Sequence, residues 1–156
     1  MIYDFRLLLT SKLGRNSVYY KEYESPMNWY KMQYPASWEM EIIENIPAFF
    51  DLEGSGALQI SAFQNQEGSY ELSDEMQRYL QMHRLNFNPE QIAKFQTVDG
   101  TEVQTCEFVK EQRFWMVYML AKEDKLILCT YNADETPDAN DARTIGSIAR
   151  SIQFIS

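Results

Sequence analysis

The sequence has 156 residues and is 45% hydrophobic, which is typical of one folded domain with a buried core. Lys and Arg total 14 against 23 Asp and Glu, and the net charge is −9. Nucleic acids and anionic membranes are bound mainly through clustered cations, so neither is expected as a partner. The run Leu7–Leu9 is too short for a signal peptide or a membrane helix, and we expect a soluble, cytoplasmic chain.

The first 34 residues combine an ambiguous start with a high density of tyrosine. Residues 1–14 fit both a helix and a strand, and the helix is the favoured interpretation. Residues 27–34 predict a strand that ends before Pro35, because a residue preceding proline is held in extended geometry.

Residues 38–63 predict a strand followed by a hairpin. The alternation in residues 38–43 is typical of a half-buried strand. Its inward residues would be Trp38, Met40 and Ile42, and its outward residues Glu39 and Glu41. Residues 49–52 and 57–63 predict the two arms of the hairpin, with a glycine-containing loop between them. The core face of its second arm would carry Leu58, Ile60 and Ala62.

Two segments have the periodicity of amphipathic helices. The first, residues 73–87, begins at Ser73 as N-cap. Its apolar stripe would be Met76, Tyr79, Leu80, His83 and Phe87. The second, residues 137–153, has Thr136 as cap and Pro137 in its first turn. Its stripe would be Ala142, Ile145, Ile148, Ala149 and Ile152.

Three consecutive antiparallel strands are predicted at residues 101–110, 113–122 and 125–131. Both alternating sets of the middle strand are apolar, which indicates that the sheet is covered on both faces. The two predicted helices are the natural covers. The fold class expected is therefore α+β, an antiparallel sheet with helices on both faces.

The two cysteines are expected to be free thiols. Pairing Lys110 with Arg113 places Cys106 opposite Val117, and the next short turn places Cys129 opposite Tyr118. The thiols would then lie two strands apart, about 9–10 Å, on opposite faces of the sheet. A disulfide cannot span that distance, and buried free thiols fit a reducing compartment.

Two stretches carry a family resemblance. The opening motif is Tyr34-Pro35-Ala36-Ser37-Trp38 followed by Leu58-Gln59-Ile60-Ser61, and the end is a helix closing on Arg150-Ser151-Ile152-Gln153-Phe154. In these features the chain resembles a bacterial member of the PsbP-like domains. Their α-β-α sandwich is shared by an extrinsic photosystem subunit and a Ran-binding import factor. The resemblance implies a single domain, with the sandwich over residues 27–155 and an extension over residues 1–26, and it implies protein binding without a shared catalytic set.

Catalytic and metal-binding motifs are weak in this sequence. His83 is the only histidine, which leaves no histidine cluster for a metal and one candidate base for a catalytic triad. The carboxylates of Glu39 and Glu41 lie about 6.5–7 Å apart along one strand face, a spacing equally typical of a solvated strand. We therefore expect no catalytic residues, no metal and no cofactor.

The aromatic residues are the main candidates for a binding site. Tyrosine and tryptophan combine large contact area with a polar group and dominate the energetically important positions of protein interfaces. The candidate partner-binding residues are Tyr19, Tyr20, Tyr23 and Trp29. Packing in the core explains the same residues equally well, and both interpretations remain open.

Two functional hypotheses follow. The first is a non-enzymatic protein-binding module that docks another protein, with a homo-oligomer as a possible outcome. The alternative is a small-molecule binder or an unrecognised hydrolase with a pocket of roughly 300 Å³ or more between sheet and helix. Its polar groups would come from His83, Glu39, Glu41 or Glu107.

Overall fold

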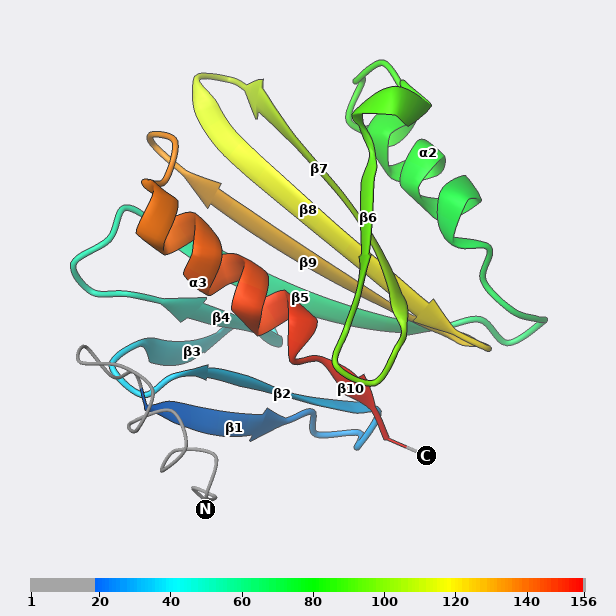
Figure 1. The fold of residues 1–156 in the computed structure, drawn as a ribbon. Helices are drawn as coiled ribbons and strands as arrows, with labels where there is room; N and C mark the ends of the chain where they lie inside the picture. Colours follow the sequence, from blue (N-terminus) through cyan, green and yellow to red (C-terminus); the bar gives the residue numbers. More distant parts are fainter. Residues whose placement is uncertain (1–18, 156) are drawn as a thin grey trace.

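A computed structural model describes residues 19–155, which form two antiparallel sheets and two helices (Figure 1). The elements in chain order are β1 (Tyr20–Glu24), β2 (Tyr30–Pro35), β3 (Glu39–Ile43), β4 (Ile46–Phe50), β5 (Gly56–Gln64), α2 (Leu72–Met82), the 3-10 turn η1 (Pro89–Gln91), β6 (Ala93–Gln96), β7 (Glu102–Lys110), β8 (Arg113–Lys122), β9 (Lys125–Ala133), α3 (Ala139–Arg150) and β10 (Gln153–Phe154). The expectation for residues 1–14 lies outside the described residues.

The larger sheet has seven strands in the order β3-β4-β5-β9-β8-β7-β6. Its centre is the predicted set of three strands, and Lys110 pairs with Arg113 as expected. The intervening residues Glu111 and Gln112 have φ values of 55° and 65°, the left-handed geometry of the tight turn that suits the twist of a hairpin. This part of the prediction is confirmed.

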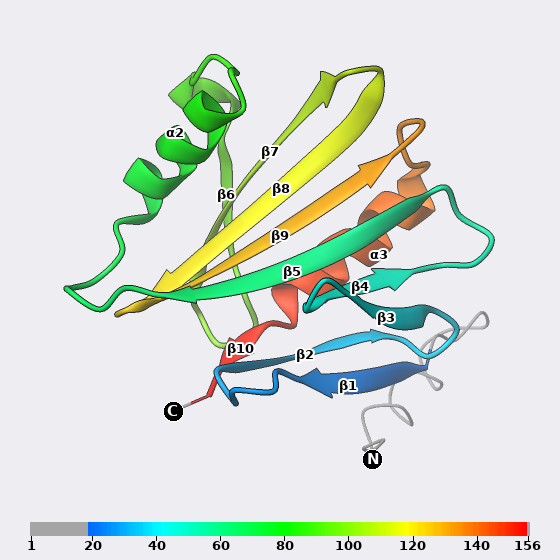
Figure 2. The same ribbon diagram turned by 180° about the vertical axis from the view of Figure 1, so that it is seen from behind.

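The smaller sheet, in the order β1-β2-β10, was not expected as a separate unit. The tyrosine-rich segment forms a hairpin in which Tyr20 pairs with Pro35 and Glu24 with Lys31. Residues 20–24, which the family resemblance left in the extension, therefore supply a strand. On the other edge of β2, the last strand pairs Phe154 with Tyr30, which brings the C-terminal end beside the hairpin (Figures 1 and 2).

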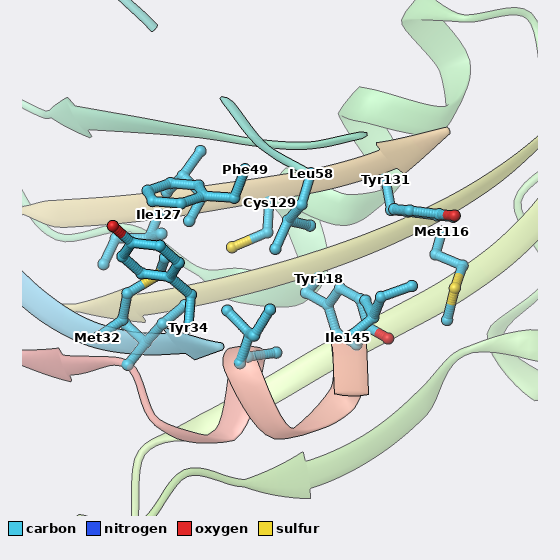
Figure 3. Packing of buried hydrophobic residues seen from close by; sticks show 14 of the residues in the cluster. Met32, Tyr34, Phe49, Leu58, Met116, Tyr118, Ile127, Cys129, Tyr131 and Ile145 are labelled. Atoms are coloured by element: carbon cyan, nitrogen blue, oxygen red, sulfur yellow. The ribbon is translucent and has the colours of Figure 1, made fainter. Parts of the chain in front are cut away.

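The buried residues form two clusters that take alternate residues of β8. The first cluster contains the α3 residues Ile145 and Ile148, and the second contains the α2 residues Met76 and Leu80. The β8 residues of the first are Phe114, Met116, Tyr118 and Leu120, and those of the second are Val117 and Met119. Helix α3 lies in front of β5 and β9 in Figure 1 and behind them in Figure 2. Figure 3 shows side chains of the first cluster, which come from both sheets and from α3, among them Tyr34 of β2, Cys129 of β9 and Ile145 of α3.

Both helices are shorter than predicted and have other caps. Helix α2 ends at Met82 rather than residue 87, since Arg84 has a left-handed φ of 61°. The Ser73 hydroxyl does not cap the helix, and instead accepts a hydrogen bond of 3.0 Å from Gln104 Nε2. Helix α3 begins at Ala139, where the Asp138 carboxylate accepts from the Asp141 amide in place of the expected cap Thr136.

The prediction that Met40 and Ile42 face the core is wrong. Both are exposed, with 37% and 54% of their surface accessible, whereas Trp38 is buried. Within residues 19–155, β3 is an edge strand that pairs with β4 alone, and all five of its residues are exposed, so neither of its faces is covered. The hairpin arm that precedes β5 spans Ile46–Phe50 rather than residues 49–52, whereas Leu58 and Ile60 are buried as expected and Ala62 is half-buried.

The cysteine prediction is confirmed. Cys106 pairs with Val117 and Cys129 with Tyr118, both thiols are free, and they belong to different clusters. Burial raises the pKa of the Cys129 thiol to about 12, and burial together with the Glu107 carboxylate raises that of Cys106 to about 11. Separately, the described residues contain no helix long and apolar enough to cross a membrane.

Candidate functional site

A cavity of about 440 Å³ opens between the smaller sheet and the edge of β5. The loop between β1 and β2 forms one wall, the start of β4 another, and the second half of β5 the third. The lining residues used below are Tyr23, Met27, Trp29, Pro47, Ala62 and Phe63. Among residues 19–155, those that line it carry no charge, so the cavity suits an apolar group rather than acid–base chemistry.

The β1–β2 loop is held in place by the buried residue Ser25. Its hydroxyl accepts hydrogen bonds from the backbone amides of Trp29 and Tyr30, at 2.9 and 3.3 Å. Its own amide donates to the Tyr30 carbonyl at 2.9 Å. These bonds define the loop while leaving Met27 at its tip 67% exposed, beside the cavity.

Tyr23 forms the inner part of the cavity wall and also supports the core. Its ring lies 5.2 Å from the Phe49 ring in an edge-to-face arrangement and 6.1 Å from Tyr30. Partial burial raises the pKa of its hydroxyl above the ordinary tyrosine value. A Tyr23 substitution therefore affects both packing and any ligand in the cavity.

Trp29 separates the apolar cavity from a polar hollow of about 570 Å³. Lys125 Nζ lies 5.2 Å from the centre of the Trp29 ring and 3.2 Å from a carboxylate oxygen of Asp124. The indole therefore presents one surface to a cation and also lines the apolar cavity.

The structure brings two of the four predicted partner-binding residues together at this cavity. Tyr23 and Trp29 line it, whereas Tyr19 and Tyr20 lie at the opposite end of the β1–β2 hairpin. Tyr19 is 51% exposed and Tyr20 half-buried. Whether any of the four contacts a partner stays a prediction.

Sequence reasoning missed the β4 and β5 walls of the cavity. Within residues 19–155, β5 pairs with β9 at all nine of its positions, but with β4 only through Gln59 and Leu58. The pairing of β5 with β4 ends at the pair of Gln59 with Ala48, and Pro47 is the next residue of β4 in that register. A proline inside a strand is a known sign of an unpaired edge. Pro47 lay outside the arm predicted at residues 49–52, so this signal was not used.

The residues proposed for a catalytic pocket are not brought together. Glu107 lines a cavity of about 230 Å³ near the end of α2, and a cavity of about 250 Å³ lies between α2 and the sheet. Neither of these, nor the 440 Å³ cavity, is lined by Glu39, Glu41 or His83. Burial and the nearby Lys110 lower the pKa of His83. Among residues 19–155 no group of three or more His, Cys, Asp or Glu could hold a metal ion.

Two solved structures share the fold. One is a protein from Bacteroides thetaiotaomicron, with a TM-score of 0.61 and 16% identity over 87% of this chain and 48% of that one. This chain thus corresponds to about half of the Bacteroides protein. The other is the cyanobacterial PsbP (CyanoP) of Synechocystis sp. PCC 6803, with a TM-score of 0.60 and 15% identity over 90% of this chain and 95% of that one. The predicted PsbP-like resemblance is confirmed at the level of the fold.

Sequence comparison adds the family. No curated protein matches the sequence. A family model does match, over residues 18–153, which is most of the chain and includes β1 and the cavity. The chain belongs to the family described as a domain of unknown function, DUF3805.

Proposed function

We propose that this protein is a non-enzymatic protein-binding module that docks its partner at the cavity beside the β1–β2 loop. The observation that carries the proposal is a cavity of about 440 Å³ lined by uncharged side chains, with Met27 and Phe63 at it 67% and 44% exposed. Apolar side chains that remain exposed around a concave site are typical of an interface.

The framework of the proposal is an α-β-α sandwich in a reducing, cytoplasmic environment. The division of buried residues into two clusters, one with α3 and one with α2, supports a helix over each face of the larger sheet. Two free thiols support the cytoplasm, because such thiols persist where disulfides are kept reduced.

Affinity capture from the native cell lysate tests the proposal. The full chain is compared with Met27→Ala and Trp29→Ala, and captured proteins are identified by mass spectrometry. Val109→Ala is the matched control, since Val109 is 68% exposed on β7 and lines none of the cavities described above. We expect one partner to be retained by the control and lost by both cavity variants.

A titration with the purified partner then tests whether Met27 and Trp29 contribute to its binding. Exposed Met27 makes little contribution to folding, so the thermal midpoint of Met27→Ala should equal that of the wild type. A partner that binds Met27→Ala and Trp29→Ala as tightly as the control would show that docking occurs elsewhere on the molecule and would overturn the proposed site.

A further inference from the structure

The hydrogen-bonding pattern of β5 determines which backbone groups face the cavity. The amide of Asn65 donates to the Asp124 carbonyl at 2.8 Å, and the pairing with β9 continues in register from there. In an antiparallel pair, alternate residues exchange hydrogen bonds with the partner strand and the residues between them point their N–H and C=O away. The odd-numbered residues of β5 therefore bond to β9, and Ile60 and Ala62 point theirs toward the cavity.

Two features explain why β4 does not use these groups: Pro47, which lacks an N–H, and the β3–β4 turn at Glu44 and Asn45, whose φ values are 52° and 69°. Continuing the register of Ala48 with Gln59 would place Pro47 opposite Ile60, at a hydrogen-bonded position. Proline has no N–H to donate to the Ile60 carbonyl, so the ladder cannot continue in the normal way. Beyond this point Ala62 has no strand partner on this edge within the part of the chain described, and the residues that would have paired line the cavity instead.

We propose that the cavity binds an extended peptide segment of a partner protein, which adds a strand to the free edge of β5 at Ile60–Gln64. This inference deepens the proposed function and rests on it. An added strand satisfies unpaired backbone groups along about 14 Å of edge, while alternate side chains of the peptide enter pockets beside it. Here the pocket is apolar, and Met27 and Phe63 would contact an apolar side chain of the peptide.

The charge of the chain indicates which peptides the cavity would attract. Beside the cavity the charges are balanced: exposed Glu24 and Glu44 directly precede lining segments, Lys31 pairs with Glu24 across the hairpin, and Lys125 lies over the Trp29 ring. The charge of the whole chain therefore decides the attraction. The whole chain carries a net charge of −9. A peptide with an apolar centre and Lys or Arg on its flanks is therefore attracted, whereas a second copy of this acidic chain is repelled.

A display library of random 12-residue peptides, screened against the full chain, provides the probe. We expect enriched peptides with an apolar centre and basic flanks, whose binding falls at least tenfold with Met27→Ala and is unchanged with Val109→Ala. Affinity should also fall steeply as salt is raised. A library that yields no binder, or binders indifferent to Met27→Ala, would overturn the peptide proposal.

Two measurements on one selected peptide separate strand addition from other modes of docking. Hydrogen exchange followed by NMR should show slower exchange of the Ala62 amide in the complex and little change at Cys106 on the far strand β7. Methylating the peptide's amide nitrogens one at a time should weaken binding at every second position, because only alternate amides face β5. These two measurements need no substitution in β5 and so do not depend on a variant that folds.

The possible failures are distinguishable. Binding without protection of Ala62, or with no alternation in the methylation series, would show that the peptide docks by side chains alone and would overturn strand addition. If no peptide binds but a lysate partner is still captured in a Met27-dependent way, the docking function stands and the extended-peptide mode is wrong. Saturable binding of a small molecule that blocks the cavity, without any peptide binding, would overturn both.

Discussion

The two halves of β5 differ in what lies along their outer edge. At Gln59 and Leu58 the strand is paired on both sides, and Leu58 is only 1% exposed. From Ile60 to Gln64 it is paired, among residues 19–155, with β9 alone, and the other side opens on the cavity. The residue types of the two halves are similar, so composition does not explain the contrast.

The difference has two causes on the neighbouring strand: Pro47, and the turn at Glu44 and Asn45 that begins β4 only at Ile46, opposite Ser61 in this register. Pro47 is tolerated because the alternation of β4 points its nitrogen away from β3, where Ile42 is its partner, and toward β5. The missing N–H and the turn together leave the outer edge of β5 open beyond Gln59. The core is not exposed, because Phe49, two residues after Pro47, is fully buried.

The largest loss of stability is expected from a substitution beside the half of β5 that is paired on both sides. Phe49 contacts the rings of Tyr23 and Tyr34, at 5.2 and 4.8 Å between ring centres, and joins the two sheets. Phe49→Ala should lower the free energy of unfolding by about 3–5 kcal/mol, the usual cost of a large-to-small change in a core. Urea denaturation measures it, and a loss below about 1 kcal/mol would contradict the assigned role of Phe49.

Gly56, at the start of β5, is the next most sensitive position. A Cβ there would meet the Tyr131 hydroxyl and lie 2.7 Å from the Cβ of Ala133, so the ring must move. Gly56→Ala should therefore cost about 1–3 kcal/mol in the same assay. Gly54→Ala is the control, because its nearest neighbour would be 3.4 Å away in ordinary contact, and it should leave stability within about 0.5 kcal/mol of wild type.

Pro47→Ala tests whether the missing N–H of Pro47 limits the pairing of β4 with β5. The substitution restores an N–H opposite the Ile60 carbonyl, so the ladder should extend and the amide at position 47 should exchange slowly. A new hydrogen bond of about 0.5–1.5 kcal/mol offsets the loss of proline's rigidity, and stability should change by less than about 1 kcal/mol. Fast exchange at that amide would show that the strands are held apart by something other than Pro47.

Neither thiol should react with a thiol reagent in the folded protein. Since the pKa values of Cys106 and Cys129 are raised to about 11 and about 12, almost no thiolate is present near about pH 8. An aromatic disulfide reagent should label neither cysteine in buffer and both in urea. Raising the pH should accelerate labelling of half-buried Cys106 before fully buried Cys129, and the reverse order would contradict their placement.

The smallest effect on stability is expected at the mouth of the cavity. Met27 is 67% exposed, and Met27→Ala should change the free energy of unfolding by less than about 0.5 kcal/mol. A larger loss, measured by urea denaturation, would indicate that the side chain packs against the cavity wall and would remove Met27 as a clean probe of binding.

Sequence reasoning succeeded where local signals determine the structure. The centre of the sheet was predicted with its register because short turns join strands of unbroken apolar alternation, and the cysteine positions followed from that register. It was wrong for Met40 and Ile42 because alternation identifies a face of a strand and not what covers it. Strands β6 and β10 were missed because segments of four and two residues carry too little periodicity.

The candidate site was predicted only in part, for a related reason. The density of aromatic residues pointed to Tyr23 and Trp29, which do line the cavity, but it also included Tyr19 and Tyr20, which lie at the far end of the hairpin. Side-chain type indicates what a residue can contact, whereas its position along a hairpin depends on pairing between distant segments.

By itself, the sequence determined the α+β class, the three central strands, the two amphipathic helices and the free thiols, since each follows from patterns within a few residues or across one turn. Only the tertiary structure decided that β1, β2 and β10 form a second sheet, and that β4 and β5 separate after Pro47. Those features depend on which strand edges meet. The backbone N–H and C=O are the same in every residue, except that proline has no N–H. The sequence therefore shows where a donor is missing, and the fold decides which acceptor is left free by it.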